Sequence, residues 1–199
     1  MFLAKLAACI LYVSTLLAPH RALAEEADLG SDESLLAVWP RYKATFIDPN
    51  GRVVDNANGG ISHSEGQGYA MLLAERLDDK DAFAKAWMWT RQNLLGDSAR
   101  LAAWRWDPAS TPHVNDTNNA TDGDLFMTWA LLEAGERWSE LDYTRAGQEL
   151  TDALARADVA SSPFGPILKP GTFGFDAKDQ RDGPVVNLSY WVFPALRLL

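Results

Sequence analysis

The sequence has almost no cysteine and little histidine. Cys9 is the only cysteine among 199 residues, and His20, His63 and His113 lack the short spacings of metal-ligand pairs. These counts exclude a disulfide framework and argue against a zinc site. We expect no metal and no cofactor.

Positive charge and long hydrophobic runs are also scarce. The chain has 18 Lys and Arg against 27 Asp and Glu, for a net charge of −9, which disfavours nucleic acid and anionic membranes as partners. One apolar run, residues 6–18, is too short for a comfortable membrane span, and Ala22-Leu23-Ala24 follows it as a small-residue cleavage site. We predict a signal peptide at 1–24, a periplasmic or secreted protein, and no stable membrane anchor after cleavage.

Helical periodicity dominates the remainder, residues 25–199. Apolar residues make up 47% of the chain and follow helical spacing in five segments, residues 33–46, 64–77, 81–94, 120–137 and 139–157. Convincing strand alternation is absent, and we expect one hairpin, at residues 169–175. Short and long connections alternate, which predicts an all-α array of helical hairpins with its function on the long-loop face.

The C-terminal stretch is apolar and has no capping residue. It ends on Leu196-Arg197-Leu198-Leu199, in the middle of an apolar stripe. We therefore expect residues 25–199 to be the N-terminal part of one longer domain. We also expect the protein to be a monomer.

A single carboxylate, Glu65, stands where a long loop enters the second helix. Ser64, Gly66 and Gly68 are small and leave its side chain open, and no basic residue adjoins it. We expect Glu65 to carry a proton and act as a general acid. The competing interpretation is a carboxylate that stabilises the first helical turn.

A second acidic cluster lies at the equivalent place before the fourth helix. Asp116, Asp122 and Asp124 fall within nine residues, and any one of them could be a helix cap. Two acidic loop-to-helix sites on one face favour a catalytic pair, as glycoside hydrolysis requires. Asp122 lies among hydroxyls, amides and backbone donors, so we expect it to stay ionised, with Asp116 and Asp124 binding substrate.

Aromatic residues supply candidate sugar-binding surfaces. Trp104 and Trp106 lie in an aperiodic loop, and Tyr190 lies in the last apolar stretch. Flat rings of this kind stack on sugar faces. For each tryptophan the alternative is that its ring fixes its own loop; for Trp129, core packing is the favoured role.

These motifs resemble glycoside hydrolase family 8. Residues 64–74 are similar to its acid-bearing motif and residues 120–138 to its signature segment, although Thr128 stands where the signature has Ala. The similarity extends to the periplasmic endoglucanases that accompany bacterial cellulose synthesis, through Trp39-Pro40, Asn93-Leu94 and residues 168–171.

The resemblance implies an (α/α)6 barrel, here an incomplete half-barrel. It also implies endo-acting, inverting hydrolysis of β-1,4-glucosidic bonds in a β-glucan, with Glu65 as proton donor. It places Asp122 at the cleavage subsite, and it implies a general base beyond residue 199 and a cellulose synthase system as a partner. Chitosan, xylan or mixed-linkage glucan as substrate, and a non-catalytic glucan-binding role, are the alternatives.

Overall fold

The computed structural model describes residues 32–95 and 101–197. The expected signal peptide, Cys9 and Ser31 lie outside the described residues. Contacts divide the chain into a unit that ends at Ala37 and a second unit, Val38–Leu199. The first unit is described only over residues 32–37, which form the beginning of the first helix.

Five helices carry the fold, and all five were predicted. They are α2 (Asp32–Phe46), α3 (Ser64–Arg76), α4 (Lys80–Thr90), α5 (Thr121–Trp138) and α6 (Leu141–Ala157). A π-helical turn, η1 (Arg91–Leu95), extends α4. Asp79 begins α4 as a cap, because its carboxylate accepts a hydrogen bond from Ala82 N at 3.1 Å.

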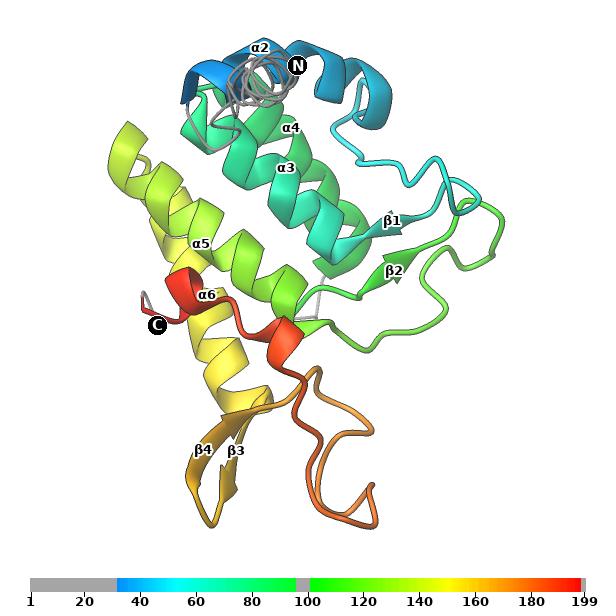
Figure 1. The fold of residues 1–199 in the computed structure, drawn as a ribbon. Helices are drawn as coiled ribbons and strands as arrows, with labels where there is room; N and C mark the ends of the chain where they lie inside the picture. The colour runs from blue at the N-terminus through cyan, green and yellow to red at the C-terminus, as the bar shows by residue number, and fades with distance from the viewer. Residues whose placement is uncertain (1–31, 96–100, 198–199) are drawn as a thin grey trace, which may run out of the picture. The chain divides into compact units, whose positions relative to one another are not determined.

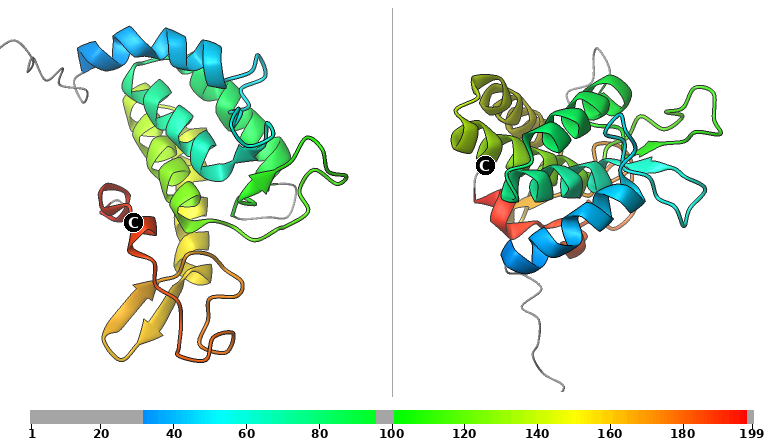
Figure 2. Two further views of the ribbon diagram at one scale, coloured as in Figure 1. Left: turned by 45° about the vertical axis from the view of Figure 1, so that its right-hand side comes forward. Right: turned by 90° about the horizontal axis from the view of Figure 1, so that it is seen from above.

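The helices form two hairpins that pack side by side. Helix α3 pairs with α4 and α5 pairs with α6, and α3 and α5 lie against each other between them (Figures 1 and 2). The join between α5 and α6 turns sharply because Ser139 adopts a left-handed conformation, with φ 56°. The predicted all-α array is confirmed, and α3 and α5 are its adjoining helices.

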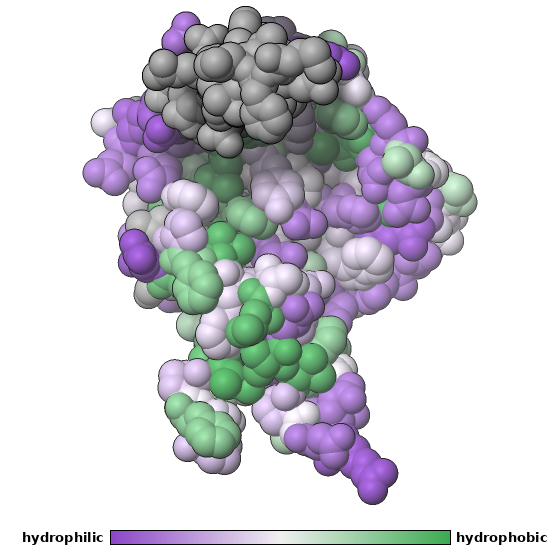
Figure 3. Space-filling model, in the orientation of Figure 1, coloured by the Kyte–Doolittle hydropathy of each residue, from purple (hydrophilic) through white to green (hydrophobic). Residues whose placement is uncertain are grey.

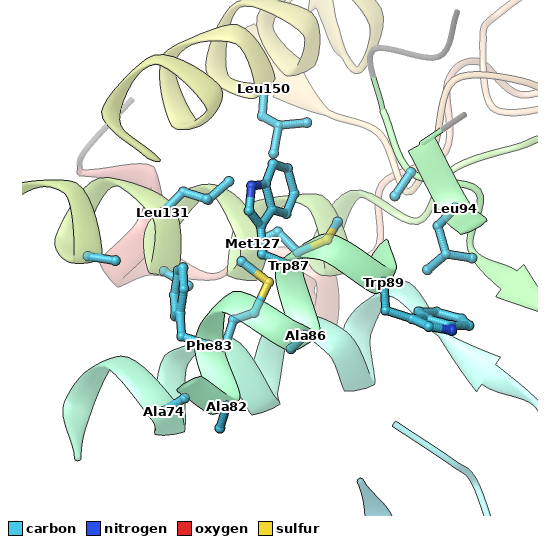
Figure 4. Packing of buried hydrophobic residues seen from close by; sticks show 14 of the residues in the cluster. Ala74, Ala82, Phe83, Ala86, Trp87, Trp89, Leu94, Met127, Leu131 and Leu150 are labelled. Atoms are coloured by element: carbon cyan, nitrogen blue, oxygen red, sulfur yellow. The ribbon is translucent and has the colours of Figure 1, made fainter. Parts of the chain in front are cut away.

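Two apolar clusters hold these hairpins together. In the larger one, Phe83 and Trp87 of α4 pack with Met127 and Leu131 of α5 and with Leu150 of α6 (Figure 4). A smaller cluster connects α5 and α6 to the C-terminal segment through Leu125, Leu154, Leu168 and Ala195. Trp129 is partly buried against this second cluster, which confirms its predicted packing role.

Two small antiparallel pairs of strands complete the described structure. Strand β1 (Ser62–His63) pairs with β2 (Arg105–Trp106), and β3 (Val159–Ser162) pairs with β4 (Gly165–Leu168). The hairpin expected at 169–175 was wrong: the strands precede that segment, and Gly165 provides the positive φ that their turn requires. Strands β1 and β2 were not predicted, because two residues are too few to show an alternation of apolar and polar side chains.

The last apolar stretch forms two short helical turns. They are the 3-10 helix η2 (Leu188–Tyr190) and α7 (Phe193–Leu196), with Pro194 in the first turn of α7, where its missing N–H costs nothing. No helix in the described ranges combines the length and apolar character needed to span a bilayer.

Candidate active site

The first turns of α3 and α5 meet at glycines. A Cβ added to Gly123 would overlap Ser64 Oγ and lie 2.7 Å from Glu65 N, and one added to Gly68 would lie 2.6 Å from Phe126 Cβ. Only glycine permits so close an approach of the two backbones. Each helix carries its candidate carboxylate as its second residue, so the contact brings Glu65 and Asp122 to one place.

The pKa of Asp122 reflects its burial and the charge of Glu65. Burial raises the pKa of Asp122 to about 6; the Gly123 N–H opposes this rise and the charge of Glu65 adds to it. The Gly123 N–H donates to Asp122 Oδ1 at 2.7 Å. Our expectation that local donors hold Asp122 firmly ionised is therefore corrected: burial outweighs them, and the group is mostly ionised only above about pH 6.

Two tyrosines lie near this pair. Tyr69 Oη donates a hydrogen bond of 2.9 Å to Glu65 Oε1. The pKa of Tyr190 is raised by burial and then by the charges of Asp122 and Glu65, so its hydroxyl is within electrostatic reach of both carboxylates. The 3-10 turn Leu188–Tyr190, capped by Asn187, thus brings a residue from the far end of the sequence to the predicted site.

Trp104 lies next to the first turn of α3. Its carbonyl accepts the N–H of Ser64 at 3.1 Å, and its half-exposed ring is stacked on His63 with centroids 5.9 Å apart. Its indole N–H donates to Asp116 Oδ2 at 2.9 Å. The other oxygen of Asp116, Oδ1, accepts the N–H of Asn118 at 2.9 Å. Asp116, predicted to bind substrate, therefore orients the ring of Trp104, and both of its oxygens already have protein partners.

The ring of Trp106 packs against other side chains of the protein. Its ring meets Trp89 edge-on at 5.7 Å, Arg52 lies 4.8 Å from its centroid, and His113 lies 4.4 Å away. These contacts fit the alternative interpretation, in which Trp106 fixes the loop that carries Trp104. They give no support to Trp106 as a substrate contact.

Asp124 is fully buried, which corrects its predicted place on a substrate surface. Its Oδ1 accepts Ala102 N at 2.9 Å and its Oδ2 accepts Asn119 Nδ2 at 2.9 Å. Burial raises its pKa to about 8; the donors oppose the shift, and the charges of Asp158 and Asp122 add to it. Both oxygens already have protein partners, so a sugar cannot reach them.

Sequence reasoning missed the network around Asp124. Asn119 Nδ2 also donates to Asp158 Oδ2 at 2.6 Å, and Asp158 accepts the hydroxyls of Thr121 and Thr172. Asp158 directly follows α6, at a position where polar residues are common. Its sequence context therefore gave no indication that it takes part in this network. The network fixes the start of α5, and hence Asp122, to the loop after β4.

Exposed apolar residues gather on one face of the described structure (Figure 3). In the orientation of Figure 1, hydrophobic residues gather below the middle of the face (Figure 3). Val186, Leu188 and Phe193 are the exposed large apolar residues of the C-terminal segment.

Within the described ranges, no group of three or more His, Cys, Asp or Glu is arranged to hold a metal ion.

The chain is similar to several known proteins. The family model described as Glycosyl hydrolases family 8 matches residues 12–199. An endoglucanase of Cellulomonas uda is 42% identical over 80% of this chain and 44% of its own length, and a probable endoglucanase of Novacetimonas hansenii is 43% identical over 79% and 45%. The solved endo-beta-1,4-glucanase CMCax from Acetobacter xylinum superposes with a TM-score of 0.79 at 38% identity, covering 84% of this chain and 52% of that one.

The chain thus spans about half the length of the relatives it matches. The likeness confirms the predicted fold class, with the hairpins α3–α4 and α5–α6 forming part of an (α/α)6 barrel.

Proposed function

Because this chain belongs to glycosyl hydrolase family 8, we propose that it provides the proton donor of an endo-acting β-1,4-glucanase. The observation that carries the proposal is the joint placement of Glu65 and Asp122 on the touching first turns of α3 and α5. Glycosidic bond cleavage needs a carboxylic acid as proton donor, and this placement sets the candidate donor beside a second carboxylate that can interact with the sugar.

In the proposed reaction Glu65 is the general acid. Its proton passes to the glycosidic oxygen while the bond from that oxygen to C1 breaks, and the bonding electrons stay on the oxygen. Asp122, mostly ionised above about pH 6, faces the positive charge that develops on the ring. Trp104 and Tyr190 would stack on or contact the sugars on either side of the bond.

Inversion requires a second acid–base group. A water molecule attacks C1 from the face opposite the leaving oxygen and gives its proton to a general base. We assign this role to a further carboxylate, because Asp124, two residues after Asp122, is buried and bound by Ala102 and Asn119. Asp122 then orients the sugar or the water.

Export is part of the proposal. The apolar run at 6–18 and the Ala22-Leu23-Ala24 site support a cleaved leader and a periplasmic or secreted enzyme. The association with a cellulose-synthesising system stays a prediction from the resemblance.

The experiment is hydrolysis of carboxymethyl cellulose by the full-length protein and its Glu65→Gln variant. We expect the variant to lose about 10²–10⁴-fold in rate, the usual contribution of a general acid. Glu149→Gln, on the exposed face of α6, is the matched control and should keep full activity. Equal activity of the two variants would reject Glu65 as the donor.

Two further measurements decide the substrate and the mechanism. Chitosan, xylan and mixed-linkage glucan, assayed in parallel, separate a glucanase from related glycanases. Proton NMR of the first products should show the α-anomer, as inversion of a β-bond demands. Binding of glucan without hydrolysis by the wild type would favour the non-catalytic alternative.

A further inference from the structure

Tyr69 lies one helical turn after Glu65 and contacts it directly. The two residues are four positions apart on α3, so their side chains share a face. The phenol donates a hydrogen bond of 2.9 Å to Glu65 Oε1. The acid therefore has one oxygen occupied by a donor of its own helix.

A second helix holds the ring of Tyr69. Its centroid lies 4.5 Å from that of Phe126 on α5, with the planes inclined at 44°. Phe126 is itself fixed against α3, since a Cβ on Gly68 would lie 2.6 Å from Phe126 Cβ. The position of the hydroxyl is thus set by the same contact that brings Glu65 and Asp122 together.

We infer that Tyr69 is a positioning residue that determines which oxygen of Glu65 delivers the proton. With Oε1 accepting the tyrosine hydroxyl, the acidic hydrogen resides on Oε2, and Oε2 is the atom presented to the glycosidic oxygen. This inference rests on the proposed function, in which Glu65 is the general acid. Tyr69 touches no substrate in this role and acts only through Glu65.

The protonation of Tyr69 is compatible with this role. Burial raises its pKa to about 12, and the hydrogen bond and charge of Glu65, followed by the charge of Asp122, add to the rise. The phenol therefore remains a donor at any pH at which the enzyme would operate. It does not compete with Glu65 as a proton source.

The test compares leaving groups in the full-length protein and its Tyr69→Phe variant. Phenyl β-cellotrioside needs its leaving oxygen protonated, whereas 2,4-dinitrophenyl β-cellotrioside leaves as a stable anion. We expect kcat on the phenyl substrate to fall by about 10–100-fold, since a misplaced catalytic group costs about that much, with KM nearly unchanged. On the dinitrophenyl substrate the variant should match the wild type.

Two results would overturn the inference. An equal loss on both substrates would mean that Tyr69 shapes the fold or the sugar site, and no loss on either would mean that Glu65 needs no positioning. Tyr143→Phe is the matched control, because it removes a phenol that packs on Phe83 and Trp138, outside the candidate site. It should behave as wild type on both substrates.

Failure of the proposed function is recognised separately, as a wild type that cleaves neither cellotrioside. In that event the crystal structure of Tyr69→Phe still decides the positioning role. We expect the Glu65 carboxyl to leave the place it occupies beside Tyr69 Oη. An unmoved carboxyl would reject the inference.

Discussion

Ser64 Oγ occupies the space that a Cβ on Gly123 would need, so α3 and α5 touch backbone to backbone at their first turns. Glu65 and Asp122 are the residues that follow Ser64 and precede Gly123. Their proximity is therefore a consequence of the missing side chain. The sequence showed the glycines as neighbours that leave the acids open, whereas the structure shows that Gly123 lets the helices approach.

Gly123→Ala should push the two helices apart. The added methyl group overlaps Ser64 and the backbone of Glu65, and overpacking of this kind costs about 1–3 kcal/mol of unfolding free energy. Gly66→Ala is the control, because its Cβ would meet Val53 at an ordinary 3.5 Å and alanine favours a helix. Urea denaturation should show a loss for Gly123→Ala and no loss for Gly66→Ala; equal stabilities would mean that the helix contact is not tight.

Thr128→Val should stabilise the protein. The Thr128 hydroxyl is fully buried and has no hydrogen-bond partner among the described residues. An apolar group of the same shape removes that desolvation penalty, and we expect a gain of about 1 kcal/mol. Thr90→Val is the opposite case, because the Thr90 hydroxyl donates to Ala86 O at 2.8 Å and accepts Gln67 Nε2 at 2.9 Å. It should lose about 1–3 kcal/mol in the same denaturation series.

Local patterns predicted the helices well because burial of one face imposes a period on each. Phe83 and Trp87 repeat at the spacing that puts both into the larger cluster, and Glu65 and Asp122 were visible as acids that open helices. The predicted carboxylate pair therefore follows from residues close in sequence to each helix start.

Contacts between distant segments could not be predicted in this way. Asp124 and Asp122 look alike in sequence, yet Asn119 and Ala102 bury one while the other stays partly exposed. Trp104 and Trp106 also look alike, and only the partners of each ring separate them. The hydrogen bond between Tyr69 and Glu65 differs from these contacts, because the two residues are four positions apart on one helix; the spacing was a local signal that the sequence analysis did not use.

Gln67→Leu should be strongly destabilising. The Gln67 amide is buried, accepts Val53 N at 2.5 Å and donates to Gly51 O, Ala86 O and Thr90 Oγ1. It joins the long loop to α4, and leucine would leave several of these groups without partners at about 1–3 kcal/mol each. Gln148→Leu on the exposed face of α6 should change stability by less than about 0.5 kcal/mol. Thermal melts of the two variants measure the difference, and matching melting temperatures would show that the loop has other support.

Asp124→Asn should flatten the pH dependence of stability. The pKa of Asp124 is about 8 in the folded chain against an ordinary value of 3.8, so between these values the folded state holds a proton that the unfolded state has released. Stability from this group is complete below about pH 4 and declines as the pH rises toward 8, by up to about 1.4 kcal/mol per pH unit. Asparagine keeps an acceptor for Ala102 N and carries no charge at any pH, so this decline should vanish.

The measurement is urea denaturation of both proteins at intervals from pH 4 to 8. The unfolding free energy of Asp124→Asn should rise relative to the wild type as the pH increases. Only the wild type has a carboxylate at this position, which must either take up a proton on folding or be buried with its charge. Asp142→Asn removes an acid that is 88% exposed on α6 and should follow the wild-type curve. Parallel curves for wild type and Asp124→Asn would mean that Asp124 is ionised in the fold, with Asn119 and Ala102 compensating its charge in full.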